Sequence, residues 1–212
     1  MAALPTYASL RMRGHPNTLL VDAVSLLGAQ RGLALDVGAG PLNDARYLLR
    51  AGFEVHAIDT DEQTTSLAAK IDDARLHVVR ADVRDAPIAP GTYAIVVAIH
   101  VLPFLPRPDV PAVMDSLAGA LTRGGILCCT FLGHDDGWAG RRPHMTFLAQ
   151  REIETLLCGL ETIEFSERRY DGRNASGEPK RWHVVRCLAR KVEATSASPR
   201  TDDQASAVGP PR

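Results

Sequence analysis

The sequence predicts an α/β protein built on a doubly wound, mostly parallel sheet. Short apolar segments of strand length alternate along the chain with segments of helical periodicity. One segment, 93–101, is almost entirely apolar, as expected of a strand buried on both faces of a parallel sheet. Near the end of the chain, two strand-like segments joined by a short connection predict an antiparallel C-terminal hairpin.

The first half of the chain contains three helices and three strands in alternation. Asn17 can cap the first helix, and Gly28 and Gly52 end the first and second helices. Either Thr60 or Asp61 can cap the third helix. The expected elements are a helix over 17–27, a strand over 33–37, a helix over 42–51, a strand over 53–58, a helix over 61–71 and a strand over 76–79.

The second half begins with the apolar strand over 93–101. Four prolines between 103 and 111 then force a loop, and the apolar positions of 113–121 recur at helical spacing. The glycine pair 124–125 is expected to turn the chain into the next strand. The remaining elements are a strand over 126–132, a loop over 133–146, a helix that contains Ile153, Leu156, Leu157 and Leu160, and strands over about 161–170 and 182–190.

Composition narrows the class of protein. The chain has 212 residues, of which 45% are hydrophobic, so it can bury the core of one domain. A net charge of −1 argues against a nucleic-acid partner, which usually requires a basic stripe. Four cysteines without a Cys-x-x-Cys spacing indicate a reduced, cytoplasmic protein. No secretory or membrane-length apolar segment is present, so no membrane association is expected.

The chain ends differ in character from the centre. Residues 193–212 contain no Leu, Ile, Met or aromatic residue and cannot bury enough apolar surface to offset the cost of ordering. We therefore expect a flexible N-terminal segment over 1–12, a folded domain over 13–191 and a disordered tail over 192–212.

The most informative motif ends the first strand. Residues 33–40 read Leu-Ala-Leu-Asp-Val-Gly-Ala-Gly, so the strand brings Asp36 to a glycine turn. Asp59 ends the next strand, where a carboxylate is placed to bind ribose hydroxyls. A nicotinamide motif needs a third glycine where this chain has Asn43, and Asp36 would repel a pyrophosphate. S-adenosylmethionine, which carries an ammonium and a sulfonium but no phosphate, fits this pattern better.

Several segments resemble known cofactor motifs. Those resembling class I S-adenosylmethionine-dependent methyltransferases are Asp-Val-Gly-Ala-Gly-Pro-Leu-Asn-Asp-Ala (36–45), Phe-Glu-Val-His-Ala-Ile-Asp (53–59) and Arg-Ala-Asp-Val (80–83). Segments 121–127 and 177–185 resemble the branch near the tellurite-resistance and thiopurine methyltransferases. The resemblance covers about 13–191 and implies a seven-stranded sheet of order 3-2-1-4-5-7-6. Many members carry glycine where Leu42 stands, and this departure narrows the loop around the methionine moiety.

The resemblance implies a cofactor site at the ends of the first four strands. Asp36 and the glycine loop would hold the methionine end, and Asp59 would accept the ribose hydroxyls. Asp82 would accept from the adenine amine. Their structural alternatives are a strand turn, a helix cap and an ordinary loop carboxylate. The expected cofactor-binding residues are Asp36, Gly38, Ala39, Gly40, Asn43, Asp59, Thr60, Asp82, Val83 and Ile99.

The acceptor side of the site is expected around the ends of strands four and five. His100 could act as a general base, because an ordinary histidine accepts a proton at neutral pH, or it could only shape the pocket. In the loop after strand five, His134, Trp138 and Arg141 are the candidate acceptor contacts; a solvated connection is the alternative.

The final strand opens with Trp182 and His183, whose side chains should point to opposite faces; packing is the favoured role for each. No metal site is expected, because His134 and His183 have no third ligand at a recognisable spacing.

The expected function is transfer of a methyl group from S-adenosylmethionine to a small-molecule acceptor. A soft acceptor, such as a thiolate or a chalcogen oxyanion, would need no base. Two alternatives remain open at this point: a binding module that has lost turnover, and, less favoured, a nicotinamide-dependent oxidoreductase.

Overall fold

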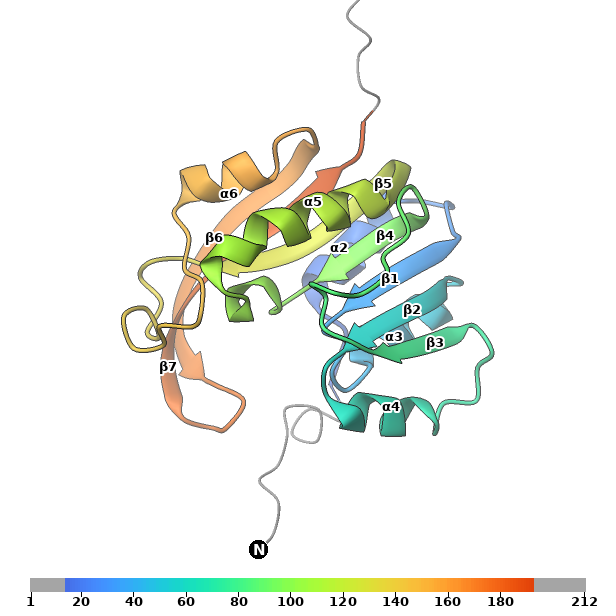
Figure 1. Ribbon diagram of the computed structural model, residues 1–212, viewed down its shortest axis with the longest axis horizontal. Helices are drawn as coiled ribbons and strands as arrows, with labels where there is room; N and C mark the ends of the chain where they lie inside the picture. Colours follow the sequence, from blue (N-terminus) through green and yellow to red (C-terminus); the bar gives the residue numbers. More distant parts are fainter. Residues whose placement is uncertain (1–13, 193–212) are drawn as a thin grey trace, which may run out of the picture.

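The computed structural model describes residues 14–192 and shows one mixed sheet between two layers of helices (Figure 1). Its strands are Leu33–Val37 (β1), Glu54–Asp59 (β2), Leu76–Arg80 (β3), Tyr93–Ala98 (β4), Leu121–Leu132 (β5), Glu161–Arg173 (β6) and Pro179–Arg190 (β7). They lie in the order β3-β2-β1-β4-β5-β7-β6. Strands β1 to β5 pair in parallel, and β7 pairs antiparallel with both β5 and β6. The expected fold class and strand order are confirmed.

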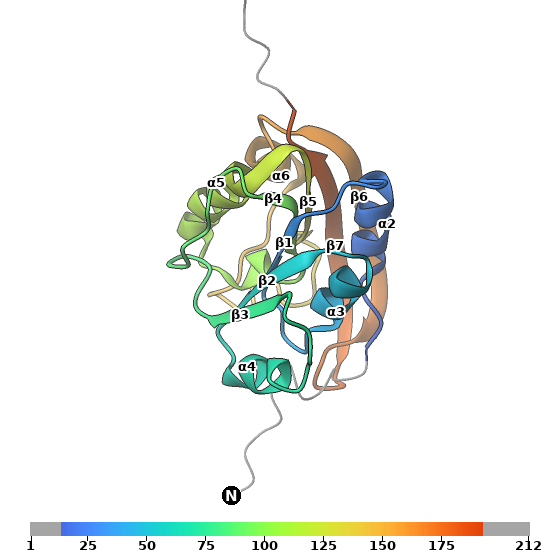
Figure 2. The same cartoon turned by 90° about the vertical axis from the view of Figure 1, so that its right-hand side faces the viewer.

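Helices cover both faces of the sheet. They are Thr18–Leu26 (α2), Asn43–Arg50 (α3), Glu62–Ala68 (α4), Val110–Ala120 (α5) and Gln150–Leu156 (α6), with 3-10 turns at Leu102–Phe104 (η1) and Arg107–Asp109 (η2). Figure 2 shows α2 and α3 on one side of the sheet and α5 and α6 on the other. Asn17 caps α2, as expected. Asp61 caps α4, and it was one of the two residues expected in that role. None of the described helices is long and apolar enough to cross a membrane.

Two hydrophobic cores fill the space between the sheet and its helices. On one face, Leu20 of α2 and Leu48 of α3 belong to a buried cluster with alternate strand residues. On the other face, Leu117 of α5 belongs to a second cluster. Cys128 and Cys129 fall in different clusters, which confirms that neighbouring strand residues face opposite sides.

Two element boundaries in the second half differ from expectation. Strand β5 starts at Leu121, so Gly124 and Gly125 lie inside it rather than forming a turn before it. The reason is a register shift beside β4, where a Cβ on Gly125 would lie 2.9–3.1 Å from backbone carbonyl oxygens. Strand β4 ends at Ala98 instead of at 101, because the chain bends at His100, whose φ is +57°.

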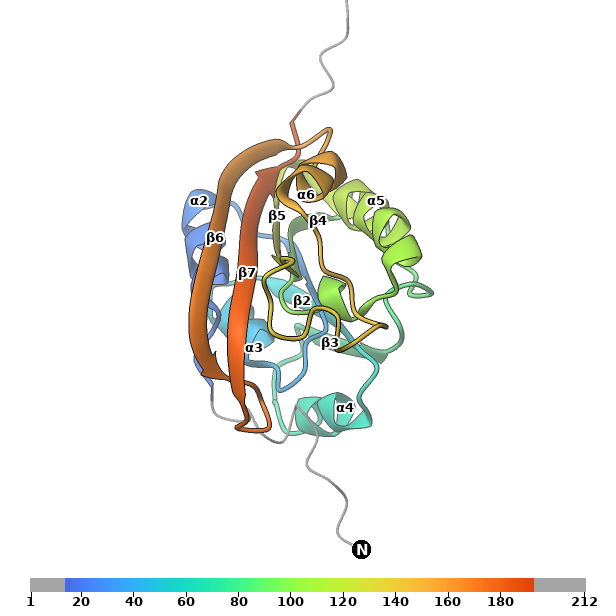
Figure 3. The ribbon, with the colours of Figure 1, turned by 90° about the vertical axis from the view of Figure 1, so that its left-hand side faces the viewer.

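The C-terminal hairpin is longer than the sequence pattern indicates. Pairing between β6 and β7 continues to Arg173 and Pro179, which leaves only 174–178 as the connection. Figure 3 shows this hairpin along the edge of the sheet that lies opposite β3. Helix α6 begins at Gln150, where the Glu152 carboxylate accepts the Ala149 N–H at 2.8 Å and fixes the first turn; it ends at Leu156, before the expected helical residues Leu157 and Leu160. The predicted segment 1–12 and residues 193–212 of the predicted tail lie outside the described residues.

Candidate functional site

The carboxyl ends of β1, β2 and β4 lie side by side at one end of the strands, where the predicted glycine loop connects β1 to α3 (Figure 1). The Gly38 and Ala39 N–H groups both donate to the carbonyl of Ile58, at 2.7 and 3.2 Å. Gly38 has a φ of +69°, and a Cβ there would lie 2.2 Å from the side chain of Val101. Only glycine therefore lets the loop after β1 pack against the segment after β4.

Asp59 fastens this loop to the end of β2. Its Oδ2 accepts the Gly40 N–H at 2.7 Å, and its Oδ1 accepts the Asp61 N–H at 2.8 Å. The buried Thr64 hydroxyl donates to the Gly40 carbonyl at 2.9 Å, which ties α4 to the same loop. Asp61, not Asp59, caps α4, so the helix-cap alternative for Asp59 is wrong. A carboxylate has about four acceptor positions, so Asp59 can still accept hydroxyl donors.

Asp36 lies buried beneath the glycine loop. Its Oδ2 receives no hydrogen bond from the described residues. Burial raises the pKa of Asp36 well above its usual range, and the nearby carboxylates of Asp44 and Asp59 raise it further. A hydrogen bond from the Ala45 N–H acts in the opposite direction on this pKa. A buried acceptor without a donor favours a ligand that brings a cation or an N–H group.

Leu42 occupies the position where a glycine is common in the resembling family. Its φ is +62°, which a residue with a Cβ adopts only at an energetic cost, and it immediately precedes α3 without making a side-chain cap. Its side chain is fully buried, so packing offsets the backbone strain. Asn43 begins α3 and is half-buried at the rim of the loop.

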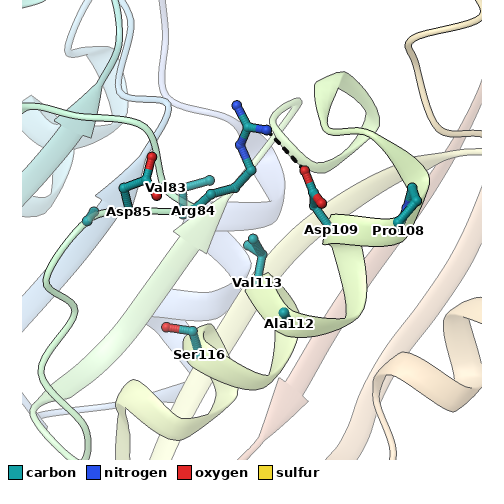
Figure 4. A pocket seen from close by; sticks show the side chains of 9 residues that line it. Val83, Arg84, Asp85, Pro108, Asp109, Ala112, Val113 and Ser116 are labelled. Carbon is teal, nitrogen blue, oxygen red and sulfur yellow. Dashed lines mark hydrogen bonds and ion pairs between the residues drawn. The ribbon is translucent and has the colours of Figure 1, made fainter.

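After β3, the two residues predicted to contact adenine have different surroundings. Both oxygens of Asp82 accept hydrogen bonds from the Arg84 guanidinium, at 2.7 and 3.0 Å, and this contact lowers the pKa of Asp82. Arg84 also reaches Asp109 at 3.0 Å (Figure 4). Val83 is buried and lines a cavity of about 510 Å³ between this segment and α5. Asp82 is thus engaged by a neighbour, and its adenine contact remains a prediction.

Beyond β4, His100 sits between the glycine loop and the C-terminal hairpin. Its N–H donates to the hydroxyl of Thr130 on β5 at 2.8 Å, and its ring lies 6.2 Å from that of Trp182. A positive φ is uncommon outside glycine, and residues held in such conformations cluster at functional sites. The neighbouring residues are the half-buried Ile99 and Val101, which contacts Gly38.

Next to His100, four aromatic side chains gather from separate elements. Trp138, in the loop after β5, lies 5.7 Å from Trp182 and 6.4 Å from Phe104, measured between ring centroids. Tyr170 of β6 stacks on Trp182 at 6.3 Å. We call this group the aromatic cluster; its members are Phe104, Trp138, Tyr170 and Trp182.

A buried ion pair lies beneath the aromatic cluster. The Lys180 ammonium contacts the Asp136 carboxylate at 2.7 Å, and both side chains are inaccessible to solvent. The same ammonium lies 3.4 Å from the ring centroid of Trp182 and 4.2 Å from that of Trp138. Desolvation lowers the pKa of Lys180, while Asp136 raises it. The cation therefore holds both indole rings by cation–π contact.

Asp136 connects this ion pair to the loop. Its Oδ1 accepts the Trp138 N–H at 3.0 Å and its Oδ2 accepts the His183 N–H at 3.1 Å. The loop after β5 is therefore bonded to β7 through one carboxylate, which contradicts the view of this loop as a solvated connection.

The predicted acceptor contacts have different surroundings. Trp138 belongs to the aromatic cluster, whereas His134 is exposed and lies 3.7 Å from Glu152 of α6. Arg141 is exposed, and its neighbour Arg142 stacks over the Trp138 ring at 4.6 Å. Lys180 and Asp136 were missed, because lysine and aspartate are rarely buried and no sequence spacing pairs them.

Trp182 and His183 face opposite sides of β7, as expected. Trp182 joins the aromatic cluster, and His183 is buried with Nε2 at 3.3 Å from Glu167. His183 Nδ1 accepts the Asp135 N–H at 3.2 Å. His134 and His183 therefore contact different carboxylates and share no ligand set.

Comparisons with known proteins find similarity to methyltransferases and to S-adenosylmethionine-related enzymes. Residues 34–125 match the family model described as "Methyltransferase domain". The chain is 30% identical over 138 residues to the carboxy-S-adenosyl-L-methionine synthase of Psychrobacter arcticus, covering 63% of this chain and 51% of the relative. The chain thus spans about half the length of that curated relative.

Solved structures share the fold. TehB from Haemophilus influenzae superposes with a TM-score of 0.69 at 21% identity, covering 82% of this chain and 62% of that one. The 1,6-didemethyltoxoflavin-N1-methyltransferase of Burkholderia thailandensis, solved with 1,6-didemethyltoxoflavin and S-adenosylhomocysteine, superposes with a TM-score of 0.66 at 18% identity. That match covers 86% of this chain and 78% of the other.

Proposed function

We propose that this chain is a class I S-adenosylmethionine-dependent methyltransferase that transfers a methyl group from S-adenosylmethionine to a small-molecule acceptor. The observation that carries the proposal is the buried Asp36 carboxylate, whose Oδ2 lacks a donor beneath the glycine loop. The ammonium of a methionine moiety supplies both a donor and a compensating charge.

The remaining residues around the loop fit the same cofactor. Asp59, at the end of β2, keeps acceptor capacity for ribose hydroxyls after binding two backbone N–H groups. Gly38 and Gly40 leave room for close approach of a ligand to the backbone. The proposed set also includes Ala39, Asn43, Thr60, Asp82, Val83 and Ile99. When bound, the cofactor supplies a methyl group that its sulfonium already activates.

The protein's own task is then to position an acceptor. Methyl transfer is an in-line displacement, so most of the rate comes from holding the nucleophile about 3 Å from the methyl carbon. We propose that His100 and the aromatic cluster form the acceptor side, because they adjoin the glycine loop through Val101. His100 takes the proton of an acceptor that arrives protonated, through whichever ring nitrogen faces it.

The aromatic cluster favours a soft or planar acceptor. Trp138 and Trp182 offer polarisable rings next to His100. Arg142, stacked on Trp138, adds a positive charge that suits an anionic acceptor. A thiolate or a chalcogen oxyanion meets these conditions and needs no base, in keeping with the resemblance to the tellurite-resistance and thiopurine branch.

We also propose that the protein works in the cytoplasm without a nucleic-acid partner. No disulfide forms among the cysteines of the described residues, which suits a reducing compartment. The net charge of −1 does not favour binding to the phosphate backbone of a nucleic acid.

Binding measurements test the cofactor. Asp59→Ala should weaken S-adenosylmethionine binding about 10- to 100-fold by calorimetry, since a hydrogen bond to a charged group contributes roughly 1.5–3 kcal/mol. Glu62→Ala, which removes an exposed carboxylate three residues away, is the control and should bind normally. Unchanged affinity in folded Asp59→Ala would remove Asp59 from the site, and tight binding of NAD instead would favour the oxidoreductase.

Turnover measurements then separate an enzyme from a binding module. Transfer of a labelled methyl group should be detected for at least one compound in a panel of thiols, chalcogen oxyanions and small aromatic amines and alcohols. Tight S-adenosylmethionine binding without transfer to any of them would support a binding module.

A further inference from the structure

A group of potential metal ligands lies on β2 and β3, away from the site described above. Glu54 and His56 are two residues apart on β2, so their side chains share one face of the sheet. His77 is the direct neighbour of His56 on β3. One ligand atom from each of these three residues lies within 4.8 Å of the other two. No sequence spacing indicates this group, because only strand pairing brings His77 beside His56.

The geometry of the group is close to that of a bound ion. His77 Nε2 and Glu54 Oε1 are 3.1 Å apart, and the two imidazole rings meet edge to face with centroids separated by 5.3 Å. A tetrahedral zinc ion at about 2.0–2.1 Å from its nitrogen ligands needs those ligand atoms about 3.3 Å apart. Glu54 and His77 are exposed, so their side chains have room to rotate toward that spacing.

Tyr93 of β4 orients one of the ligands. Its hydroxyl lies 3.0 Å from Nδ1 of His56, which fixes the imidazole ring and leaves Nε2 for another partner. Metal-binding histidines commonly hold their second nitrogen in such a hydrogen bond.

The surroundings leave room for a fourth ligand. A cavity of about 140 Å³ adjoins the group and is lined by both histidines and Tyr93, together with apolar residues such as Val79 and Pro87. The segment from β3 to β4 contains no helix, so this face of β2 and β3 lacks the cover that α5 gives to β4 and β5 (Figure 1). Water can therefore complete the coordination.

We propose that Glu54, His56 and His77 form a binding site for a divalent metal ion of the zinc type, with a fourth position open to water. Two imidazoles and a carboxylate suit Zn²⁺ and similar transition-metal ions, whereas Mg²⁺ and Ca²⁺ prefer oxygen ligands alone. The ion ties the edge strand β3 to β2. On β2, His56 lies three residues before Asp59. The metal site uses none of the residues proposed to bind the cofactor, so the two proposals are independent.

Zinc titration of the full chain tests this proposal. Calorimetry with ZnCl₂ should detect binding to the wild-type protein, and ZnCl₂ in excess should raise its melting temperature. His77→Gln and, separately, His56→Gln should weaken binding at least tenfold without altering S-adenosylmethionine affinity. Tyr93→Phe should weaken it about tenfold through loss of the orienting hydrogen bond. His134→Gln changes an exposed histidine outside the group and should bind zinc like the wild type.

Cobalt provides a second measurement. Co²⁺ bound by the wild-type protein should show the visible absorption of a four- or five-coordinate complex, and His77→Gln should lose it. Equal zinc affinity in the wild type, His56→Gln and His77→Gln would overturn the site, as would the absence of binding to the wild type. Neither outcome affects cofactor binding at the carboxyl end of β2.

Discussion

Asp36, the proposed partner of the cofactor's ammonium, is a source of instability in the free protein. Its pKa is raised by burial and by Asp44 and Asp59 from the ordinary value of 3.8. Between the unfolded and folded pKa values, the folded chain holds the proton and the unfolded chain does not. The free energy of unfolding therefore falls as pH rises above about 4, and this loss is complete once pH exceeds the folded pKa.

Asp36→Asn should consequently stabilise the free protein and weaken the binding of S-adenosylmethionine. Its melting temperature should match the wild type near pH 3.5 and exceed it increasingly toward neutral pH. Its S-adenosylmethionine affinity should fall about 10- to 100-fold, because a charge-assisted contact is lost. Asp72→Asn, at an exposed position, is the control and should show neither effect. A destabilised Asp36→Asn at pH 7 would show that the carboxylate is satisfied in the free protein.

His100 can be tested as a base by its pH dependence. For an acceptor that arrives protonated, His100→Asn should lower turnover roughly 10²- to 10⁴-fold and leave cofactor affinity nearly intact. Asparagine is chosen because it tolerates the positive φ at this position, and His100→Ala provides the comparison. The loss should shrink as pH rises and the acceptor ionises unaided.

A pocket-shaping His100 gives a different profile. The variants would then chiefly raise the acceptor KM, with little dependence on pH. Unchanged turnover and unchanged KM across the pH range would assign His100 neither role.

The loop after β5 and the strand β7 form one unit through the Lys180–Asp136 ion pair. Lys180→Met keeps the side-chain length but leaves a buried carboxylate without its partner, which costs about 3–5 kcal/mol. We expect a marked fall in melting temperature and a raised acceptor KM, because both indoles lose their cation. Adding Asp136→Asn removes the unpaired charge and should recover part of the stability.

An exposed ion pair gives the matched control for this measurement. Arg169 and Asp135 also link β6 to the loop, but both side chains are well exposed. Arg169→Met should therefore change the melting temperature little. If Lys180→Met were equally mild, the buried pair would not be what holds the loop.

How far the sequence predicts these elements depends on the kind of signal. Apolar patterns together with capping and turn residues located every strand and α-helix of the described residues, and the family resemblance implied the strand order. The two 3-10 turns, η1 and η2, lie in the segment expected to be a loop. The predicted start of β5 was wrong because a local irregularity in its pairing with β4 determines it. Gly125 lies there beside backbone carbonyl groups, which leave no room for a Cβ. The cofactor loop follows from local spacing, whereas Lys180 and the Glu54–His56–His77 group depend on strand pairing over a long separation.

At the scale of the whole molecule, different parts of the sheet supply the residues of the proposed cofactor side and of the proposed acceptor side. The carboxyl ends of β1, β2 and β4 carry the cofactor loop and His100, while the hairpin of β6 and β7 supplies Trp182 and Lys180. The proposed metal site lies on the remaining edge, at β3. The proposed acceptor side therefore depends on the pairing of β7 with β5, although the hairpin supplies no residue of the glycine loop.

Truncation tests where the folded unit ends. The last paired residue of β7 is Arg190, and the Lys191 ammonium then donates to the carbonyls of Gly119 and Leu121 at 3.0 and 2.8 Å. A chain ending at Val192 keeps these contacts and should match the full chain in melting temperature and turnover, because residues 193–212 have no large apolar side chain to bury. A chain ending at Ala189 loses both and should melt several degrees lower. A large loss already at Val192 would show that the removed segment packs on the domain.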